Sequence, residues 1–132
     1  MENCLFCKII SNEIPAYKIY EDDDFLAFLD ISQTTKGHTL VIPKKHYRNI
    51  YDVDEDTVAK IHQLAFKLAK QITKKLNAQG VNILNNNEAI AGQTIFHYHV
   101  HIIPRYRDDD KISIVFNENI DSNIEETYHI LK

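Results

Sequence analysis

The feature that most constrains the fold is the run His97-Tyr98-His99-Val100-His101-Ile102-Ile103, in which histidines alternate with apolar residues. A β-strand directs alternate side chains to opposite faces and rises about 3.3 Å per residue. As a strand, the run places its three histidines on one face, about 7 Å apart, and its apolar residues on the other. Proline cannot donate a backbone hydrogen bond, so Pro104 is predicted to end this strand.

Three interpretations of the histidine face remain open from these residues. The first is a half-exposed edge strand whose polar face happens to be histidine. The second is a metal cluster, because imidazole commonly binds zinc, copper or nickel. The third is phosphate chemistry, in which one imidazole attacks phosphorus and its neighbours bind the phosphate oxygens.

Length and charge limit the class of protein. The chain has 132 residues, 44% of them hydrophobic, which fits one compact domain with a substantial core. A net charge of −4 argues against a nucleic-acid partner. No apolar run approaches the roughly 20 residues that span a bilayer, and the first residues lack a signal-peptide pattern. We therefore expect a cytoplasmic protein without membrane partners, whose two cysteines stay reduced.

Hydrophobic periodicity predicts one long helix among several strands. From Asp54 to Ala78 apolar residues recur at spacings of three and four, with Asp54 as the N-cap and Gly80 as the stop signal. A short helical segment is expected within residues 1–16. Strands are predicted at 17–21, 25–30, 38–42, 81–84, 97–103 and, more weakly patterned, 112–116. One helix among hairpin-connected strands indicates an α+β domain with an antiparallel sheet.

The histidine run matches the His-x-His-x-His-x-x signature of the histidine triad (HIT) superfamily, which the chain resembles over residues 4–105. The similarity continues through Cys4–Ile10, Leu26–Ile31 and Gly37–Lys44 to Pro104. It implies one HIT domain over residues 1–132, with 106–132 as a C-terminal tail. The implied fold is a five-stranded antiparallel sheet with one long helix and a short N-terminal helix, the sheets joining across a homodimer.

The resemblance also implies an activity, namely a nucleotide hydrolase or nucleotidyl transferase. Its substrate is a purine nucleoside 5′-phosphate that bears a leaving group on phosphorus, of the phosphoramidate or acyl-phosphate type. The middle histidine, His99, corresponds to the nucleophile that forms a covalent nucleotidyl intermediate. His101 would donate to a phosphate oxygen, His97 and His38 would orient the nucleophile, and Thr94 would assist the leaving group.

Nucleotide-binding positions follow from the same resemblance. Asp30 corresponds to the ribose ligand, and Asn86, Gly92 and Gln93 to phosphate contacts, although three consecutive asparagines leave that register open by one residue. Apolar positions that line the base correspond to Phe6, Ile9, Leu29 and Ile31. Plain core packing is the alternative for these apolar residues.

The pair Cys4-x-x-Cys7 has three interpretations from its spacing: a redox dithiol, two buried thiols, or half of a zinc site. The resemblance favours a structural zinc, because bacterial family members with this pair complete the site with two histidines. These correspond to His46 and His97. No organic cofactor is implied.

Two other functions compete with a phosphoramidate-type hydrolase of the Hint branch. One is a diadenosine polyphosphate hydrolase of the Fhit branch, which the segment Ala91–Thr94 and Pro104-Arg105 resemble more closely. The other is a non-catalytic, nucleotide-binding regulatory dimer. A histidine at position 99 argues against it, since a pure binder has no need of a nucleophile. The chain also lacks the tryptophan that is usual in the Hint tail.

Overall fold

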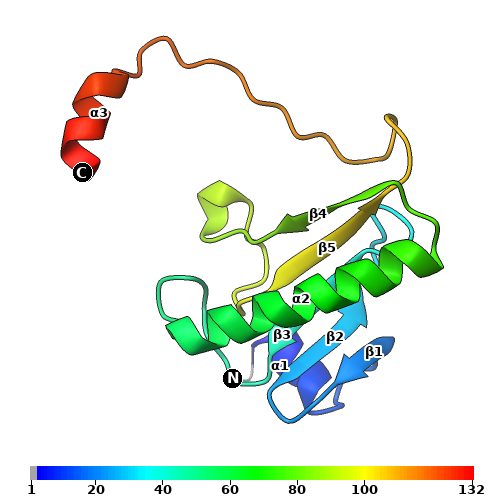
Figure 1. The fold of residues 1–132 in the computed structure, drawn as a ribbon. Helices are drawn as coiled ribbons and strands as arrows, with labels where there is room; N and C mark the ends of the chain where they lie inside the picture. Colours follow the sequence, from blue (N-terminus) through cyan, green and yellow to red (C-terminus); the bar gives the residue numbers. More distant parts are fainter. Residues whose placement is uncertain (1–2) are drawn as a thin grey trace.

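The computed structural model describes residues 3–132, in which five strands form one antiparallel sheet of order β1-β2-β3-β5-β4 (Figure 1). The strands are β1 (Lys18–Glu21), β2 (Phe25–Leu29), β3 (Thr39–Pro43), β4 (Gly80–Leu84) and β5 (Val100–Arg105). The helices are α1 (Leu5–Ile10), α2 (Glu55–Lys75) and α3 (Ile124–Leu131), with a 3₁₀ turn η1 (Ala89–Ala91). The predicted α+β fold is confirmed. Among these helices, none has both the length and the apolar character that crossing a membrane requires.

The central strands of the sheet are buried on both faces, which explains their nearly continuous apolar sequence. Helix α2 covers one face, where its buried residues pack against alternate residues of β2, β3 and β5. This cluster comprises Phe25, Ala27, Val41, Ile61, Ala65, Leu68, Ala69, Tyr98, Val100 and Ile102. Helix α1 covers the other face, with the cluster Phe6, Ile9, Leu26, Phe28, Leu40 and Ile42. The histidines therefore lie on the α1 side of the sheet.

The ends of α2 follow from local chemistry. The Asp54 carboxylate caps the helix by accepting the Thr57 backbone N–H at 3.0 Å, as predicted. The helix ends at Lys75, earlier than the predicted Ala78, because Asn77 adopts a left-handed φ of 56°. The N–H of Ala78 then bonds the Thr73 carbonyl at 2.9 Å, which closes the helix before Gly80 is reached.

The histidine strand differs from the prediction at both ends. Regular pairing begins at Val100, although His97 and His99 keep the alternation of faces. Pro104 lies inside β5, opposite Val81, so the prediction that it ends the strand was wrong. Pairing with β3 stops at Ile102, and the Pro104 carbonyl accepts the Thr35 hydroxyl at 2.6 Å. Proline has no backbone N–H, and at Pro104 that position faces the β3 side of the strand, where pairing has already ended.

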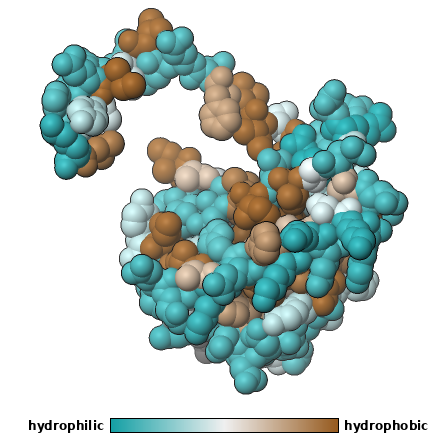
Figure 2. All heavy atoms as spheres, in the orientation of Figure 1, coloured by the Kyte–Doolittle hydropathy of each residue, from teal (hydrophilic) through white to brown (hydrophobic). Residues whose placement is uncertain are grey.

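The segment after β5 leaves the body of the protein and ends in α3 (Figure 1). The strand expected at residues 112–116 was wrong, because that segment has no regular structure. Asn123 instead caps α3 by accepting the Glu126 N–H at 3.1 Å. Figure 2 shows apolar side chains exposed along this tail. They are Ile114, Val115, Phe116, Ile120, Ile124, Tyr128, Ile130 and Leu131.

Candidate active site and metal centre

Sheet register brings the fourth histidine to the histidine run. Leu40 pairs with His101 and Thr39 with Ile102, so His38, directly before β3, lies beside β5. The Nε2 atom of His38 is 2.9 Å from Nδ1 of His101, a hydrogen bond between the two rings. Residues 63 positions apart in the chain thus form one cluster.

His99 is held in one tautomer. Its Nδ1 lies 2.7 Å from the His97 carbonyl, which can only accept, so Nδ1 carries the proton and Nε2 the lone pair. The ring is only 4% exposed, and the Phe6 ring packs against it in an edge-to-face arrangement at a centroid distance of 5.1 Å. No buried side-chain nitrogen or oxygen in residues 3–132 lacks a partner, so the unpaired Nε2 reaches the solvent.

Burial keeps these imidazoles neutral near pH 7. Loss of hydration lowers the pKa of His99 and of His38, while the nearby Asp30 carboxylate partly opposes the shift. The pKa of His101 falls to about 4, first through burial and then through the neighbouring His99 and His38 rings. A neutral imidazole has the lone pair that a nucleophile requires.

Four sulfur and nitrogen atoms converge from Cys4, Cys7, His46 and His97, all within 4.8 Å of one another. The distances from Sγ of Cys4 and of Cys7 to Nδ1 of His97 are 3.4 and 3.5 Å, and Cys7 Sγ lies 3.4 Å from Nδ1 of His46. The two Nδ1 atoms are 3.1 Å apart. A tetrahedral zinc ion with ordinary bond lengths places its sulfur and nitrogen ligands roughly 3.3–3.8 Å apart. The three sulfur–nitrogen distances fall in this range and the two nitrogens lie slightly closer, so the donor set fits zinc in chemistry and nearly in spacing.

The protonation of His97 agrees with a metal-ligand role. Its Nε2 donates to the Pro43 carbonyl at 2.8 Å, which leaves the Nδ1 lone pair directed at the sulfurs. Burial lowers its pKa to about 4, and burial together with the adjacent Cys4 raises the pKa of the Cys7 thiol to about 11. A hydrogen-bonded second nitrogen is the usual arrangement around a metal-bound imidazole.

The predicted phosphate-contacting residues lie on the loop between β4 and His97. The Asn86 amide nitrogen is 3.4 Å from the point that a Cβ on Gly92 would occupy, so Asn86 and Gly92 are adjacent. Thr94 is exposed. Gln93 is buried, and its side-chain amide already accepts two hydrogen bonds and donates two within the protein, so any contact it makes with a ligand would use its backbone.

The residues predicted to contact the nucleoside differ in how far they are buried. Asp30 follows β2 with its Oδ2 3.8 Å from Nε2 of His38, and Oδ1 accepts the Ser32 N–H at 2.8 Å. Ile31 is 85% exposed, whereas Phe6 and Ile9 are buried in the α1-side core. Leu29 is partly buried at the end of β2. Phe6 and Ile9 thus have a packing role, and a contact with a base remains a prediction for all four apolar residues.

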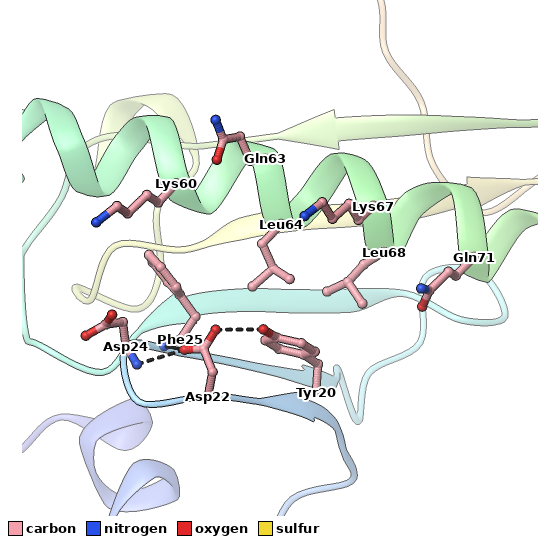
Figure 3. A pocket seen from close by; sticks show the side chains of 10 residues that line it. All are labelled: Tyr20, Asp22, Asp24, Phe25, Lys60, Gln63, Leu64, Lys67, Leu68 and Gln71. Atoms are coloured by element: carbon pink, nitrogen blue, oxygen red, sulfur yellow. Dashed lines mark hydrogen bonds between the residues drawn. The ribbon is translucent and has the colours of Figure 1, made fainter.

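A depression away from the histidines lies between α2 and the β1–β2 turn (Figure 3). The Tyr20 hydroxyl donates to Asp22 at 2.7 Å, and the backbone N–H groups of Asp24 and Phe25 donate to the same carboxylate at 2.8 and 2.7 Å. The Asp22 carboxylate thus closes the turn between β1 and β2. The hydrogen bonds at the depression thus serve the turn, and none of the predicted site residues lines it.

Sequence reasoning missed the side chains that attach the loop to the rest of the protein. Asn85 donates to the His99 carbonyl at 2.9 Å, and Arg48 and Asn49 both bond the Glu88 carboxylate. These contacts join residues 14 to 40 positions apart. No local pattern signals such pairs.

Together, the fold and site define an α+β protein with two adjoining imidazole clusters, one open to the solvent and one arranged for a metal. Comparison with known proteins identifies the family: the HIT domain model matches residues 11–108, and the chain belongs to this family. Protein hit of Bacillus subtilis is 50% identical over 120 residues, covering 91% of this chain and 83% of that protein. The crystal structure of a HIT family protein from Bacillus anthracis is 45% identical, with a TM-score of 0.91 over 98% of this chain and 92% of that one.

Two further relatives have names that bear on chemistry. A crystal structure described as a zinc-bound histidine triad family protein from Mycobacterium smegmatis is 43% identical, with a TM-score of 0.79, covering 91% of this chain and 85% of that one. Adenylylsulfatase HINT3 of Arabidopsis thaliana is 43% identical over 107 residues, which are 81% of this chain and 54% of that longer protein. The chain is thus a Hint-like member of the family.

Proposed function

We propose that the protein is a nucleotide hydrolase or nucleotidyl transferase that acts through a covalent nucleotidyl-His99 intermediate. The observation that carries this proposal is the state of His99: Nδ1 is fixed on the His97 carbonyl, and Nε2 has no hydrogen-bond partner among residues 3–132. A buried imidazole held in this way has a lone pair in a set direction. That is the requirement for attack on phosphorus.

The proposed reaction has two displacements. The Nε2 lone pair of His99 attacks the α-phosphorus, a P–N bond forms, and the bond to the leaving group breaks with its electrons going to that group. Positive charge then develops on the ring, and the Nδ1–H bond to the His97 carbonyl stabilises it. Water attacks the same phosphorus, the P–N bond breaks with its electrons returning to Nε2, and the nucleoside monophosphate is released with His99 restored. The proton that this water loses replaces the one given to the leaving group.

Neighbouring groups support both steps. We assign His101 to the non-bridging phosphate oxygens, because its Nδ1 is bonded to His38 and its Nε2 has no partner in the described structure. His38 then orients His101, and Thr94, which is exposed, supplies a proton to the departing atom. Donors aimed at the place where charge develops lower the barrier most effectively in a partly desolvated site.

The nucleotide is proposed to lie between Asp30 and the loop. A carboxylate suits the paired ribose hydroxyls, and Oδ2 of Asp30, which lies 3.8 Å from Nε2 of His38, accepts no hydrogen bond from the described residues. Asn86 and Gly92 are placed together for a phosphate, and the missing side chain of Gly92 allows close backbone approach. Leu29 and Ile31 are proposed to contact the base.

Zinc is proposed to bind Cys4, Cys7, His46 and His97. When bound, it would cross-link α1 to the catalytic segment and fix the orientation of His97. The proposal is supported by the spacing of the four donors and by the zinc-bound relative. His97 would then orient His99 through its carbonyl while it serves as a metal ligand.

The substrate is proposed to be a nucleoside 5′-phosphate with a good leaving group. The name adenylylsulfatase describes such chemistry for the relative from Arabidopsis thaliana, in which sulfate leaves an adenylyl group. This favours the Hint-like alternative over a dinucleotide polyphosphate hydrolase. The Nε2 atom of His99, for which the described residues provide no partner, favours an enzyme over a binding module.

We also propose a homodimer in the cytoplasm. Edge strand β4 exposes Val81 and Ile83, and the neighbouring face of α2 exposes Phe66 at 61%. A second copy would pair this edge and cover these side chains, and would give the apolar tail a surface to pack against. Two thiols held as metal ligands agree with a reducing compartment.

The test compares hydrolysis of adenosine 5′-phosphoramidate and diadenosine tetraphosphate by the purified protein, with His99→Ala as the control. We expect the phosphoramidate to be preferred and a nucleotidyl adduct to appear on His99 in rapidly quenched samples. Preference for the dinucleotide would replace the Hint-like assignment by the Fhit-like one. Binding of AMP without turnover of either compound would replace catalysis by nucleotide sensing.

A further inference from the structure

The loop of residues 85–96, which contains Asn86, Gly92 and Thr94, is built around a residue in an unusual backbone conformation. Glu88 has φ 78° and ψ 155°, a region that glycine occupies almost exclusively. A side chain persists there only when the surrounding contacts over-determine the conformation. The contacts of Glu88 therefore show what holds the loop.

Both the side chain and the backbone of Glu88 make hydrogen bonds to other residues. Its carboxylate accepts Nε and Nη2 of Arg48 at 3.1 and 2.8 Å, and Nδ2 of Asn49 at 2.7 Å. Its backbone N–H donates to Oε1 of Gln93 at 2.8 Å, and its carbonyl accepts the backbone N–H of Gln93 at 3.2 Å. The Arg48 hydrogen bonds, followed by that from Asn49, lower the pKa of Glu88 to about 2, so the carboxylate is charged under all ordinary conditions.

These contacts differ from a simple surface ion pair because their centre is buried. Asn49 is 1% exposed and Gln93 is 3% exposed, and Oε1 of Gln93 also accepts Nδ2 of Asn49 at 3.1 Å. The Gln93 amide nitrogen donates to the carbonyls of Arg48 and Ile95 at 2.8 and 3.1 Å. Releasing Glu88 would remove partners from two buried amides, which costs more than separating two exposed charges.

The same loop is tied to the nucleophile at its start. Asn85 donates to the carbonyl of His99 at 2.9 Å, and its own Oδ1 accepts the Asn87 amide at 2.7 Å. Asn87 also accepts the backbone N–H of Ile50 at 2.7 Å. The segment of Arg48 to Ile50 thus anchors the loop on one side, and the His99 backbone anchors it on the other.

We propose that Glu88 is a positioning residue for the nucleotide reaction: its carboxylate, bound by Arg48 and Asn49, fixes the phosphate-binding loop relative to His99. The inference rests on the proposed function, which supplies the phosphate that the loop binds. A pre-ordered loop binds phosphate without first losing conformational freedom, so its loosening weakens binding in the ground state and the transition state alike. Arg48, whose guanidinium also stacks on Phe96 at 4.3 Å, is the partner that sets the position of the carboxylate.

The experiment compares Glu88→Gln, Glu88→Gly and Arg48→Ala with the wild-type full chain. Glutamine keeps the strained backbone and removes the charge, whereas glycine removes both the strain and the carboxylate. We expect KM for the phosphoramidate and the Kd of AMP to rise about ten-fold in all three, with kcat within about three-fold. The double variant Arg48→Ala/Glu88→Gln should be no worse than either single variant, because the two side chains act as one unit.

Hydrogen exchange of the loop provides a readout that does not depend on turnover. We expect faster exchange of the backbone N–H groups of Ala91 and Gln93, which bond the Glu88 carbonyl, in each variant. Wild-type KM and wild-type exchange in Glu88→Gly would overturn the proposal. A fall in kcat at constant KM would also overturn it, by showing loss of folded protein instead. If wild type turns over neither substrate, the proposed function fails, and the exchange rates alone decide whether Glu88 fixes the loop.

Discussion

The two imidazole clusters use the same residue type in opposite ways. In the metal cluster, the donor atoms of Cys4, Cys7, His46 and His97 point at one another, and the second nitrogen of His97 is bonded to a carbonyl. In the open cluster, His99 and His101 each engage only Nδ1, and their Nε2 atoms have no partner in the described structure. A closed set of donors suits a structural metal, and an open nitrogen suits chemistry.

The comparison also shows how the clusters are connected. His97 belongs to the metal cluster through its ring and to the open cluster through its carbonyl, which fixes the tautomer of His99. The rings of His97 and His99 both pack against Phe6 on the α1 face of the sheet, and the His97 carbonyl joins the two clusters. The function of each histidine thus follows from its partners.

The largest expected effect is in the open cluster. Replacing His99 with alanine removes the nucleophile, and turnover should fall by about 10³-fold or more. The fold should persist, because the hydrogen bond that the ring makes, to the His97 carbonyl, is local. His62→Ala, which removes an exposed imidazole from α2, is the matched control and should keep wild-type rates. An unfolded His99→Ala protein, or one with substantial turnover, would contradict the assignment.

A smaller loss is expected from the second member of the open cluster. His101→Ala removes the proposed donor to the phosphate oxygens, and kcat should fall about 10²–10³-fold. The nucleotidyl intermediate should still form, only more slowly, because His99 is unchanged. Single-turnover kinetics with trapping of the adduct measure this directly. A variant unable to form any adduct would transfer the nucleophilic role from His99 to His101.

The metal cluster should respond differently, through stability and metal content. In Cys4→Ser/Cys7→Ser, bound zinc measured by atomic absorption should fall from about one per chain to near zero, and Tm should fall with it. Activity should drop about 10–100-fold, because His97 loses its fixed orientation. The same variant with full activity would show that the two clusters are independent.

Sequence reasoning recovered most of the fold because its signals are local. Alternation located the two faces around Tyr98 and Val100, and three-to-four spacing located α2. It failed where tertiary context decided the outcome: Pro104 is tolerated inside β5 because pairing with β3 has already ended. The helix α3 was missed because its eight residues carry a short, weak pattern and bury none of their side chains.

The residues of the candidate site likewise divide into those that a local sequence signal reveals and those that it does not. Local spacing identified the histidine run, and the resemblance added the positions that meet it in space, such as His38 and His46. The bonds from Arg48 and Asn49 to Glu88 were not predicted, because they join residues about 40 positions apart without a shared motif. Side chains that support a site through long-range contacts leave no periodic signal in one sequence.

The smallest expected effect concerns the response of the open cluster to acid. The pKa of His101 is about 4 in the folded protein, against an ordinary value of 6.5 in the unfolded chain. Between these values the unfolded state binds more protons, so the free energy of unfolding decreases as the pH falls from 6.5 toward 4. This decrease in the free energy of unfolding is at most about 3 kcal/mol, and it is absent above pH 7. Urea unfolding of wild type and His101→Asn from pH 4 to pH 7.5 measures it, and the variant should show the shallower dependence. Equal slopes for the two proteins would mean that His101 is solvated enough to titrate normally, and the open cluster would then be more polar than its burial implies.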